Sequence, residues 1–208
     1  MKKIGALAGL IFFAVLAGGC FLHPMVSNQG TAIRPSSASA PSQVLVVYYS
    51  YSGNTRRAAE NLALLLQGDL YEIKPTIGYS TPPVLALLRS SAEEQLSWLP
   101  ALAGPLPDVS GYQLLLVGGP VWRGKVARPL ASWLALNDLS GKKVVPFWTC
   151  DGDAGAYAAD FASQIAPVPA EGLELSQAGG LTDEAMQKIL TDWIARSHLV
   201  PLAAQTGK

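Results

Sequence analysis

From residue 44 onward, short runs of β-branched and aliphatic residues alternate with longer segments whose apolar residues recur at helical spacing. The pattern predicts strands at 44–49, 70–73, 113–117, 143–148 and 172–175. It predicts helices at 55–67, 83–99, 126–136, 154–165 and 182–197. Strands that alternate with helices favour a parallel sheet, and runs such as VLVV and LLLV suit strands covered on both faces. We therefore expect an α/β fold with three layers, a sheet between two layers of helices.

The segment 75–111 is the hardest part of the chain to interpret, because six prolines flank one helical pattern. That pattern carries Leu85, Leu88, Leu96 and Leu99, which predict an amphipathic helix.

The first 20 residues have the character of an export signal. Lys2 and Lys3 precede an uncharged stretch of about 14 residues, too short at ~1.5 Å per residue to span a hydrocarbon layer of ~30 Å but typical of a signal peptide. The stretch ends in LAGGC, which resembles the lipobox of bacterial lipoproteins. This resemblance implies a signal peptide at 1–19 and a lipid on Cys20. A signal peptide cut elsewhere and an uncleaved anchor are the alternatives.

The residues after Cys20 predict a membrane tether. The segment 20–43 contains PSSASAPSQ and few bulky apolar residues, and a flexible chain of this length reaches about 25–30 Å. We expect the folded domain at 44–199, a C-terminal tail at 200–208, and a location in the cell envelope facing the periplasm. The residue after Cys20 is Phe21 and not an aspartate. In lipoproteins of this kind, that difference favours the outer membrane.

Charge and cysteine content exclude several classes of function. Lys+Arg and Asp+Glu each number 15, and removing Lys2 and Lys3 leaves 13 basic against 15 acidic residues, a net charge of −2. This balance predicts no nucleic-acid binding. With Cys20 lipidated, Cys150 has no intramolecular partner for a disulfide. The two histidines, His23 and His198, give no metal-site pattern, and we expect a monomer.

Three loops follow the first, third and fourth predicted strands, at 50–55, 118–125 and 149–157. In an open parallel sheet, ligands bind outside the carboxyl ends of the strands where the strand order reverses. These loops read SYSGNT, GGPVWRGK and TCDGDAGAY, and they are the most distinctive segments of the domain. We expect them on one edge of the sheet, forming one ligand site.

The first loop has the composition of a phosphate-binding turn. It leads into a helix N-terminus, where free N–H groups and the helix dipole favour an anion. Ser50, Ser52 and Thr55 add hydroxyl groups, Gly53 permits a positive φ and Asn54 tolerates one. The loop has no lysine, which excludes the nucleoside-triphosphate pattern and favours a phosphate monoester. A plain capped turn is the alternative.

The second and third loops each supply an aromatic side chain. Pro120 and Val121 place Trp122 at the end of the third strand, among polar residues and glycines. Tyr157 follows Asp153 by four residues, and we expect its ring to face Trp122 across a gap. Stacking of a flat heteroaromatic ring between them would contribute about 0.5–1.5 kcal/mol for each aromatic.

The three loops together resemble the flavodoxin family. The segment VVYYSYSGNTRRAA at 46–59 is similar to its FMN-phosphate motif, GGPVW to its second flavin loop and GDAGAYAADF at 152–161 to its third. The resemblance implies a flavodoxin-like, doubly wound sheet of five parallel strands in the order 2-1-3-4-5, bound FMN and one-electron transfer. It implies an FMN site made of Ser50, Tyr51, Ser52, Gly53, Asn54, Thr55, Pro120, Val121, Trp122, Arg123, Gly124, Thr149, Cys150, Asp151, Gly152, Asp153 and Tyr157.

The sequence departs from the family pattern at two places. Many short-chain relatives have Thr-Ser-Gly-Gly where this chain has TCDGD, and some have an aromatic residue where Arg123 stands. Near a flavin, Asp151 and Asp153 would lower the potential of the second reduction, because negative charge disfavours the reduced anion. Arg123 and Lys125 would oppose this effect if they point inward.

Several alternatives remain open at this point. The redox partner is a protein or a quinone. An NAD(P)H-dependent FMN or quinone reductase uses the same fold, although the sequence has no G-x-G-x-x-G after a strand. A third possibility is a flavin-free domain that binds a partner. Cys150 is a small buried apolar residue, a redox-active thiol or one half of an intermolecular disulfide.

Overall fold

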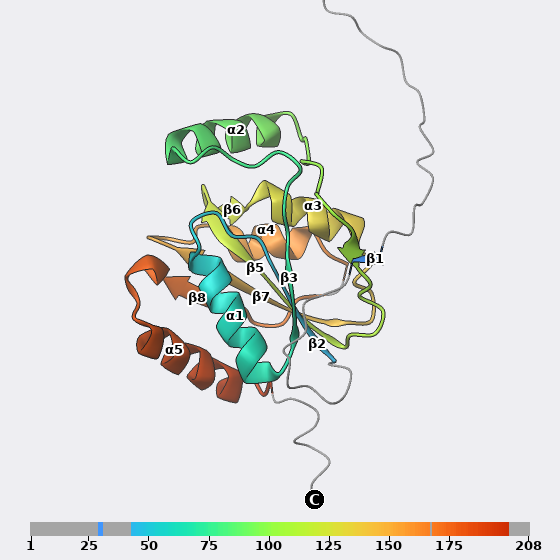
Figure 1. Cartoon of the computed structure of the whole chain (residues 1–208), viewed down its shortest axis with the longest axis vertical. Helices are drawn as coiled ribbons and strands as arrows, with labels where there is room; N and C mark the ends of the chain where they lie inside the picture. Colours follow the sequence, from blue (N-terminus) through green and yellow to red (C-terminus); the bar gives the residue numbers. More distant parts are fainter. Residues whose placement is uncertain (1–28, 31–42, 167, 200–208) are drawn as a thin grey trace, which may run out of the picture.

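Five parallel strands form the central sheet of the computed structural model, which describes residues 29–30, 43–166 and 168–199 (Figure 1). In spatial order the strands are β3 (Asp69–Glu72), β2 (Val44–Tyr48), β5 (Leu114–Trp122), β7 (Lys143–Cys150) and β8 (Leu173–Ser176). Counted along the chain, this is the order 2-1-3-4-5, which confirms the expected topology. The signal peptide at 1–19, Cys20, most of the tether at 20–43 and the tail at 200–208 lie outside the described residues.

Helices cover both faces of the sheet (Figure 1). One face carries α1 (Asn54–Leu66) and α5 (Asp183–Arg196), and the other carries α3 (Arg128–Leu136) and α4 (Tyr157–Ser163). A further helix, α2 (Pro83–Gln95), lies beyond α3 and makes few contacts with the rest of the fold. A short 3-10 helix, η1 (Ala178–Gly180), precedes α5, whose N-cap Thr182 accepts a hydrogen bond from the Ala185 N–H as its sequence predicts.

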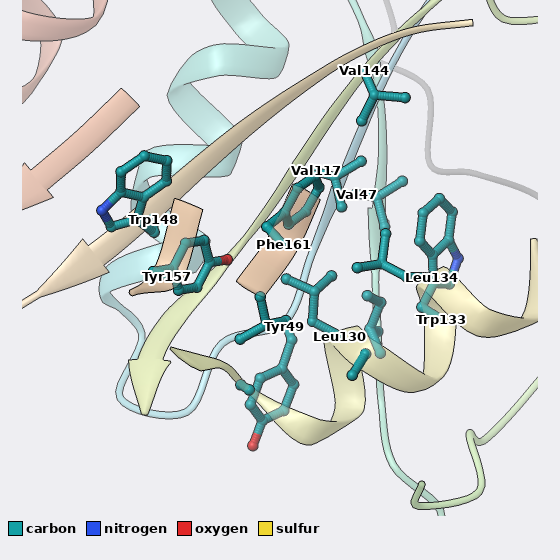
Figure 2. Close-up of a cluster of buried hydrophobic side chains, with 14 of the residues drawn as sticks. Val47, Tyr49, Val117, Leu130, Trp133, Leu134, Val144, Trp148, Tyr157 and Phe161 are labelled. Carbon is teal, nitrogen blue, oxygen red and sulfur yellow. The ribbon is translucent and has the colours of Figure 1, made fainter. Parts of the chain in front are cut away.

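Alternating side chains of the strands fill two cores. In β2, Leu45 and Val47 pack on the α3/α4 side, whereas Val46 and Tyr48 pack on the α1/α5 side. Figure 2 shows the α3/α4 core, where Trp133 lies beside the aliphatic side chains of the strands. This double coverage explains why the strand runs are apolar at every position.

The third strand is longer than its sequence predicts. β5 continues through Trp122 and pairs with the antiparallel β6 (Lys125–Val126), so that 118–125 is a strand end and a hairpin rather than an open loop. The glycines look like loop residues, but packing requires them: a Cβ on Gly118 would lie 2.2 Å from Phe147 Cζ, and one on Gly119 would lie 2.9 Å from Leu130 Cδ2.

Two residues of the expected tether pair with the domain. β1 (Gln29–Gly30) forms a short parallel pair with β4 (Leu106–Pro107). Within the described residues, no helix is long and apolar enough to cross a bilayer.

Candidate flavin site

The turn between β2 and α1 has the backbone conformation of an anion-binding site. Gly53 precedes the helix with a φ of 97°, in the left-handed region, and its N–H donates to Ser50 Oγ at 3.2 Å. In the described part of the chain no side chain caps α1, so its first N–H groups remain available to a ligand. The predicted role of this turn is therefore compatible with its geometry.

Thr55 serves a different purpose from the other hydroxyl groups of the turn. Its side chain is buried, and its Oγ1 lies 2.8 Å from Thr149 Oγ1 in a hydrogen bond. This bond joins the first turn of α1 to the end of β7 and fixes the distance between two of the three loops.

The two arginines after the turn point away from it. Arg56 pairs with Glu72 on β3. Arg57 donates from Nη2 to the carbonyl oxygens of Ala178 and Leu181, both at 2.8 Å. They fix the neighbouring segments, and the turn presents only neutral groups to an anion.

A cleft of about 260 Å³ opens beside this turn, at the carboxyl edge of the sheet. It brings together nine of the residues predicted from the three loops: Tyr51, Ser52, Asn54, Pro120, Val121, Trp122, Thr149, Cys150 and Asp151. Pro83, Ala86 and Leu87 of α2 complete the lining and were not predicted. The apolar run PPVLALL was the only signal for them, and it does not show which way the helix faces.

Trp122 forms one wall of the cleft and is fixed by three tyrosines. Its ring centroid lies 4.8 Å from that of Tyr79, 5.6 Å from Tyr49 and 5.9 Å from Tyr51, all in edge-to-face geometry. The Tyr51 hydroxyl bonds in turn to the carbonyl oxygens of Ser80 and Thr81. The indole is therefore held rigidly before any ligand binds.

Tyr157 does not lie in this cleft, and the expectation that it faces Trp122 across a gap is wrong for this structure. Its side chain is fully buried, with its ring centroid 5.0 Å from Trp148 and 6.4 Å from Phe161 (Figure 2). The physical reason is the start of α4: the helix begins at Tyr157, not at 154, and the side chain enters the core. Burial raises the pKa of the phenol.

Arg123 and Gly124 form the β5–β6 turn outside the cleft, both with positive φ. Arg123 bonds to Ser91 and lies 3.8 Å from a Glu94 carboxylate oxygen, and Lys125 pairs with the same Glu94. The lysine holds the pKa of the Glu94 carboxyl below its usual value. Neither cation points into the cleft, so neither opposes Asp151 directly.

Gly124 also fixes the position of the third loop. A Cβ on Gly155 would lie 2.9 Å from Gly124 Cα, so the two backbones meet closely and glycine is required there. In the same loop, Asp153 accepts the Gly155 N–H at 2.8 Å, and Gly152 and Asp153 remain outside the cleft lining.

Cys150 lies at the end of β7 with its side chain buried. Its Sγ donates to the Gly152 carbonyl oxygen at 3.1 Å, and burial raises the thiol pKa. A raised pKa disfavours the nucleophilic thiolate, which favours a packing role over a reactive one.

A second cavity of about 470 Å³ lies on the other side of Tyr51. It shares Tyr51, Ser52 and Pro83 with the cleft and reaches Lys74 and Glu72 near β3. The two spaces are therefore neighbours along this edge of the sheet. No cluster of three His, Cys, Asp or Glu side chains that could hold a metal occurs in the described ranges.

The family model described as flavodoxin matches residues 43–196, which is the whole described domain apart from its last residues. The chain belongs to the flavodoxin family. No curated protein matches the sequence at a significant level.

Solved structures with the same fold include candidate flavoproteins of two Bacteroides species. That of Bacteroides uniformis is 26% identical with a TM-score of 0.63, over 75% of this chain and 99% of its own. That of Bacteroides eggerthii is 29% identical with a TM-score of 0.63, over 76% and 98%. A flavoprotein of Lactobacillus acidophilus in complex with FMN is 25% identical with a TM-score of 0.58, over 66% and 95%. This flavodoxin-family chain thus spans nearly the full length of each relative.

Proposed function

We propose that this protein is an FMN-binding electron-transfer protein, anchored by a lipid on Cys20 and facing the periplasm. The observation that carries the FMN proposal is the cleft itself, where an uncapped helix N-terminus and the Trp122 indole meet at the carboxyl edge of the sheet. Membership of the flavodoxin family and the relative crystallised with FMN support the same cofactor.

The residues of the cleft fit the two chemical parts of FMN. The phosphate would take the backbone N–H groups and hydroxyls of the turn, where Gly53 gives the backbone its left-handed conformation. The flat apolar ring system would contact Trp122, Tyr51 and Leu87. The turn presents no cation, which suits one phosphate monoester better than a diphosphate or triphosphate.

Bound FMN supplies the capacity to accept and release electrons, and the protein sets how readily it does so. Asp151 is the acidic residue of the cleft lining, and the nearest basic side chains of the β5–β6 turn are directed to Glu94. Asp151 therefore disfavours added negative charge on the part of a bound ligand that lies beside it.

The lipid anchor rests on the sequence alone, on LAGGC after a short apolar stretch that is preceded by two lysines. The outer membrane follows from Phe21 in the same resemblance. Intact-mass measurement of the protein extracted from membranes tests the anchor, because lipidation of Cys20 adds the mass of the acyl groups and removes residues 1–19.

The cofactor proposal is tested by titrating the full chain with FMN, followed by ultraviolet-visible absorbance and flavin fluorescence, and then by stepwise reduction at controlled potential. We expect saturable binding of one FMN per chain and a reduction midpoint that differs from that of free FMN. Riboflavin is the matched control ligand, because it has the ring system without the phosphate, and it should bind more weakly. Equal affinity for the two would contradict the proposed role of the turn.

A reductase is the second candidate, and the cavity beyond Tyr51 favours it. That space of about 470 Å³ adjoins the cleft and is large enough for part of a second ligand. Oxidation of NADH or NADPH by the FMN-loaded protein with a quinone acceptor distinguishes the two functions, since a carrier alone shows no turnover with these reagents. A chain that binds no flavin under any condition would instead be a partner-binding domain.

A further inference from the structure

The helix α2 exposes apolar side chains that a surface helix normally buries. Its buried positions are Ala86, Ser90 and Glu93, spaced as one helix face. The opposite side carries exposed apolar residues beside Ser91 and Gln95, whereas a helix on the surface of a soluble domain normally turns its apolar residues inward. We define the α2 apolar face as Val84, Leu85, Leu88, Leu96 and the following Trp98.

Three residues of this face belong to one row along the helix. Val84, Leu88, Ala92 and Leu96 follow each other at intervals of four residues, which places them one above the other along the helix. Leu88 is 61% exposed and Leu96 is 76% exposed. The four leucines that predicted an amphipathic helix, Leu99 included, are all on the outside.

The outward direction of the row is fixed by polar contacts on the inner face. The buried carboxylate of Glu93 accepts from Arg89 Nε at 2.8 Å and from the Tyr79 hydroxyl. Arg89 also donates from Nη1 to the carbonyl oxygens of Ile77 and Gly78, and its guanidinium lies 4.2 Å from the centre of the Tyr79 ring. Turning the helix over would take Glu93 away from Tyr79 and Arg89 away from the carbonyl oxygens of Ile77 and Gly78, which would break this network.

The proposed anchor restricts what can cover this face. Cys20 precedes Gln29 by nine residues, and Gln29 is paired with Leu106 of β4. Nine residues span at most about 30 Å when fully extended, so a lipid on Cys20 holds the domain close to the bilayer. Leu106 and Tyr79 both pack against the core cluster on the α3/α4 side of the sheet, and α2 lies on this same side, beyond α3 (Figure 1).

The chemistry of the α2 apolar face also suits a bilayer surface. Aliphatic side chains and one tryptophan, 53% exposed, are the side chains that enter the boundary between headgroups and acyl chains. Arg123 and Lys125 lie beside α2 and outnumber their shared partner Glu94, which leaves a positive rim toward lipid phosphates. With 13 residues, α2 is suited to lie along the surface and not to cross it.

We propose that the α2 apolar face docks on the surface of the membrane to which Cys20 is anchored; this proposal rests on the lipid anchor proposed above. Because Pro83, Ala86 and Leu87 line the flavin cleft from the inner side of α2, docking of the outer side would hold the cleft one helix diameter, ~10 Å, from the bilayer surface. A second copy of the chain and a soluble redox protein are the competing occupants.

A fluorescent label on α2 tests the proposal in the full chain. Leu88→Cys is labelled with an environment-sensitive dye, and the lipidated protein is placed in vesicles of phosphatidylethanolamine and phosphatidylglycerol. Cys150 is buried, with a thiol pKa raised by burial, so the added thiol reacts first. Leu64→Cys is the matched control, because Leu64 is 68% exposed on α1, on the opposite face of the sheet.

We expect the label at position 88 to shift to shorter wavelength and to be quenched by brominated acyl chains several-fold more than the label at position 64. Equal quenching at the two positions would overturn the proposal. A shift that grows with the protein-to-lipid ratio, without quenching by brominated lipid, would identify a second copy and would also overturn it.

Failure of the anchor gives a different result from failure of docking. If the measured mass shows no lipid on Cys20, the anchor is disproved. Docking is then tested by flotation of the unlipidated protein with the same vesicles, in parallel with its Leu85→Gln/Leu88→Gln variant. Flotation of the parent chain but not of the variant supports docking by α2. Equal flotation of the parent chain and the variant disproves docking by α2. Both substitutions are at exposed positions, so little change in stability is expected.

Discussion

Thr55 and Thr149 are 94 residues apart in the chain, and their hydroxyl oxygens lie 2.8 Å apart in a buried hydrogen bond beside the cleft. The bond joins the phosphate-type turn to the end of β7, so two of the three loops move as one unit. Preorganisation of this kind lowers the entropy that a ligand must remove when it binds.

Thr149→Val should destabilise the domain and weaken FMN binding, because the substitution leaves the buried Thr55 hydroxyl without its partner. The expected loss in the free energy of unfolding is about 1–3 kcal/mol. Urea denaturation measures the stability, and FMN titration measures the affinity. The double variant Thr55→Val/Thr149→Val is the control, since removing both hydroxyls should recover part of the stability. Additive losses in the double variant would contradict the coupling.

Trp122→Leu should weaken FMN binding by removing the aromatic wall of the cleft. Loss of stacking worth about 0.5–1.5 kcal/mol corresponds to an increase in Kd of roughly 2- to 12-fold. Trp122→Phe, which keeps a ring against the three tyrosines, should retain more of the affinity. Fluorescence titration with FMN measures both variants, and thermal unfolding without FMN separates ligand loss from core damage. The same Kd in Trp122→Leu as in the parent chain would exclude contact between Trp122 and the flavin.

Tyr157→Phe should leave FMN affinity unchanged and should stabilise the domain. The Tyr157 hydroxyl is buried without a hydrogen-bond partner among the described residues, and such a group costs about 1–3 kcal/mol relative to an apolar atom. Thermal unfolding of the flavin-free protein should therefore give a higher Tm for the variant. A clear loss of FMN affinity in Tyr157→Phe would show that the phenol reaches the ligand after all.

The sheet could be predicted from sequence because its signals are local. Each strand is a short apolar run, each connection has helical periodicity, and the strand order follows from the family resemblance. The conformation of the turn at 50–55 could also be predicted from sequence, since Gly53 and the hydroxyl residues around it act through their own backbone and side chains. Such features need no knowledge of distant contacts.

The features that sequence reasoning missed depend on contacts between distant segments. Gly118 and Gly119 were interpreted as loop because their partners, Phe147 and Leu130, come later in the chain. The direction of α2 is set by Glu93 through Tyr79 and Arg89, while the leucine pattern by itself suggested the opposite face as the buried one. A helical wheel shows which residues share a face, but it does not show which face is covered.

Asp151→Asn should raise the potential of the second reduction of bound FMN by removing a negative charge from the cleft lining. The side chain is exposed, so the expected change is modest, on the order of tens of millivolts at low salt and less at high salt. A redox titration with indicator dyes measures it. Asp153→Asn is the matched control: its carboxylate bonds to the Gly155 N–H and does not line the cleft, so its effect should be smaller. A larger effect of Asp153→Asn would reverse the assignment.

Cys150 should react slowly with iodoacetamide, because burial raises its thiol pKa and only the thiolate is a good nucleophile. An unfolded cysteine ionises near pH ~8.5, so the folded protein keeps its proton at a pH where the unfolded chain loses it. The folded state then binds more protons than the unfolded state, and this contribution to stability is present below that pH and is lost as the pH rises through the folded pKa.

The measurement is the alkylation rate from pH 7 to pH 10, followed by mass spectrometry, with the urea-unfolded protein as the control for an ordinary thiol. We expect the folded protein to react more slowly throughout and its rate to rise at a higher pH than that of the control. FMN should slow the reaction further, since Cys150 lines the cleft. Rapid alkylation of the folded protein at pH 7 would instead indicate a stabilised thiolate, and Cys150 would then be a candidate for redox chemistry beside the flavin.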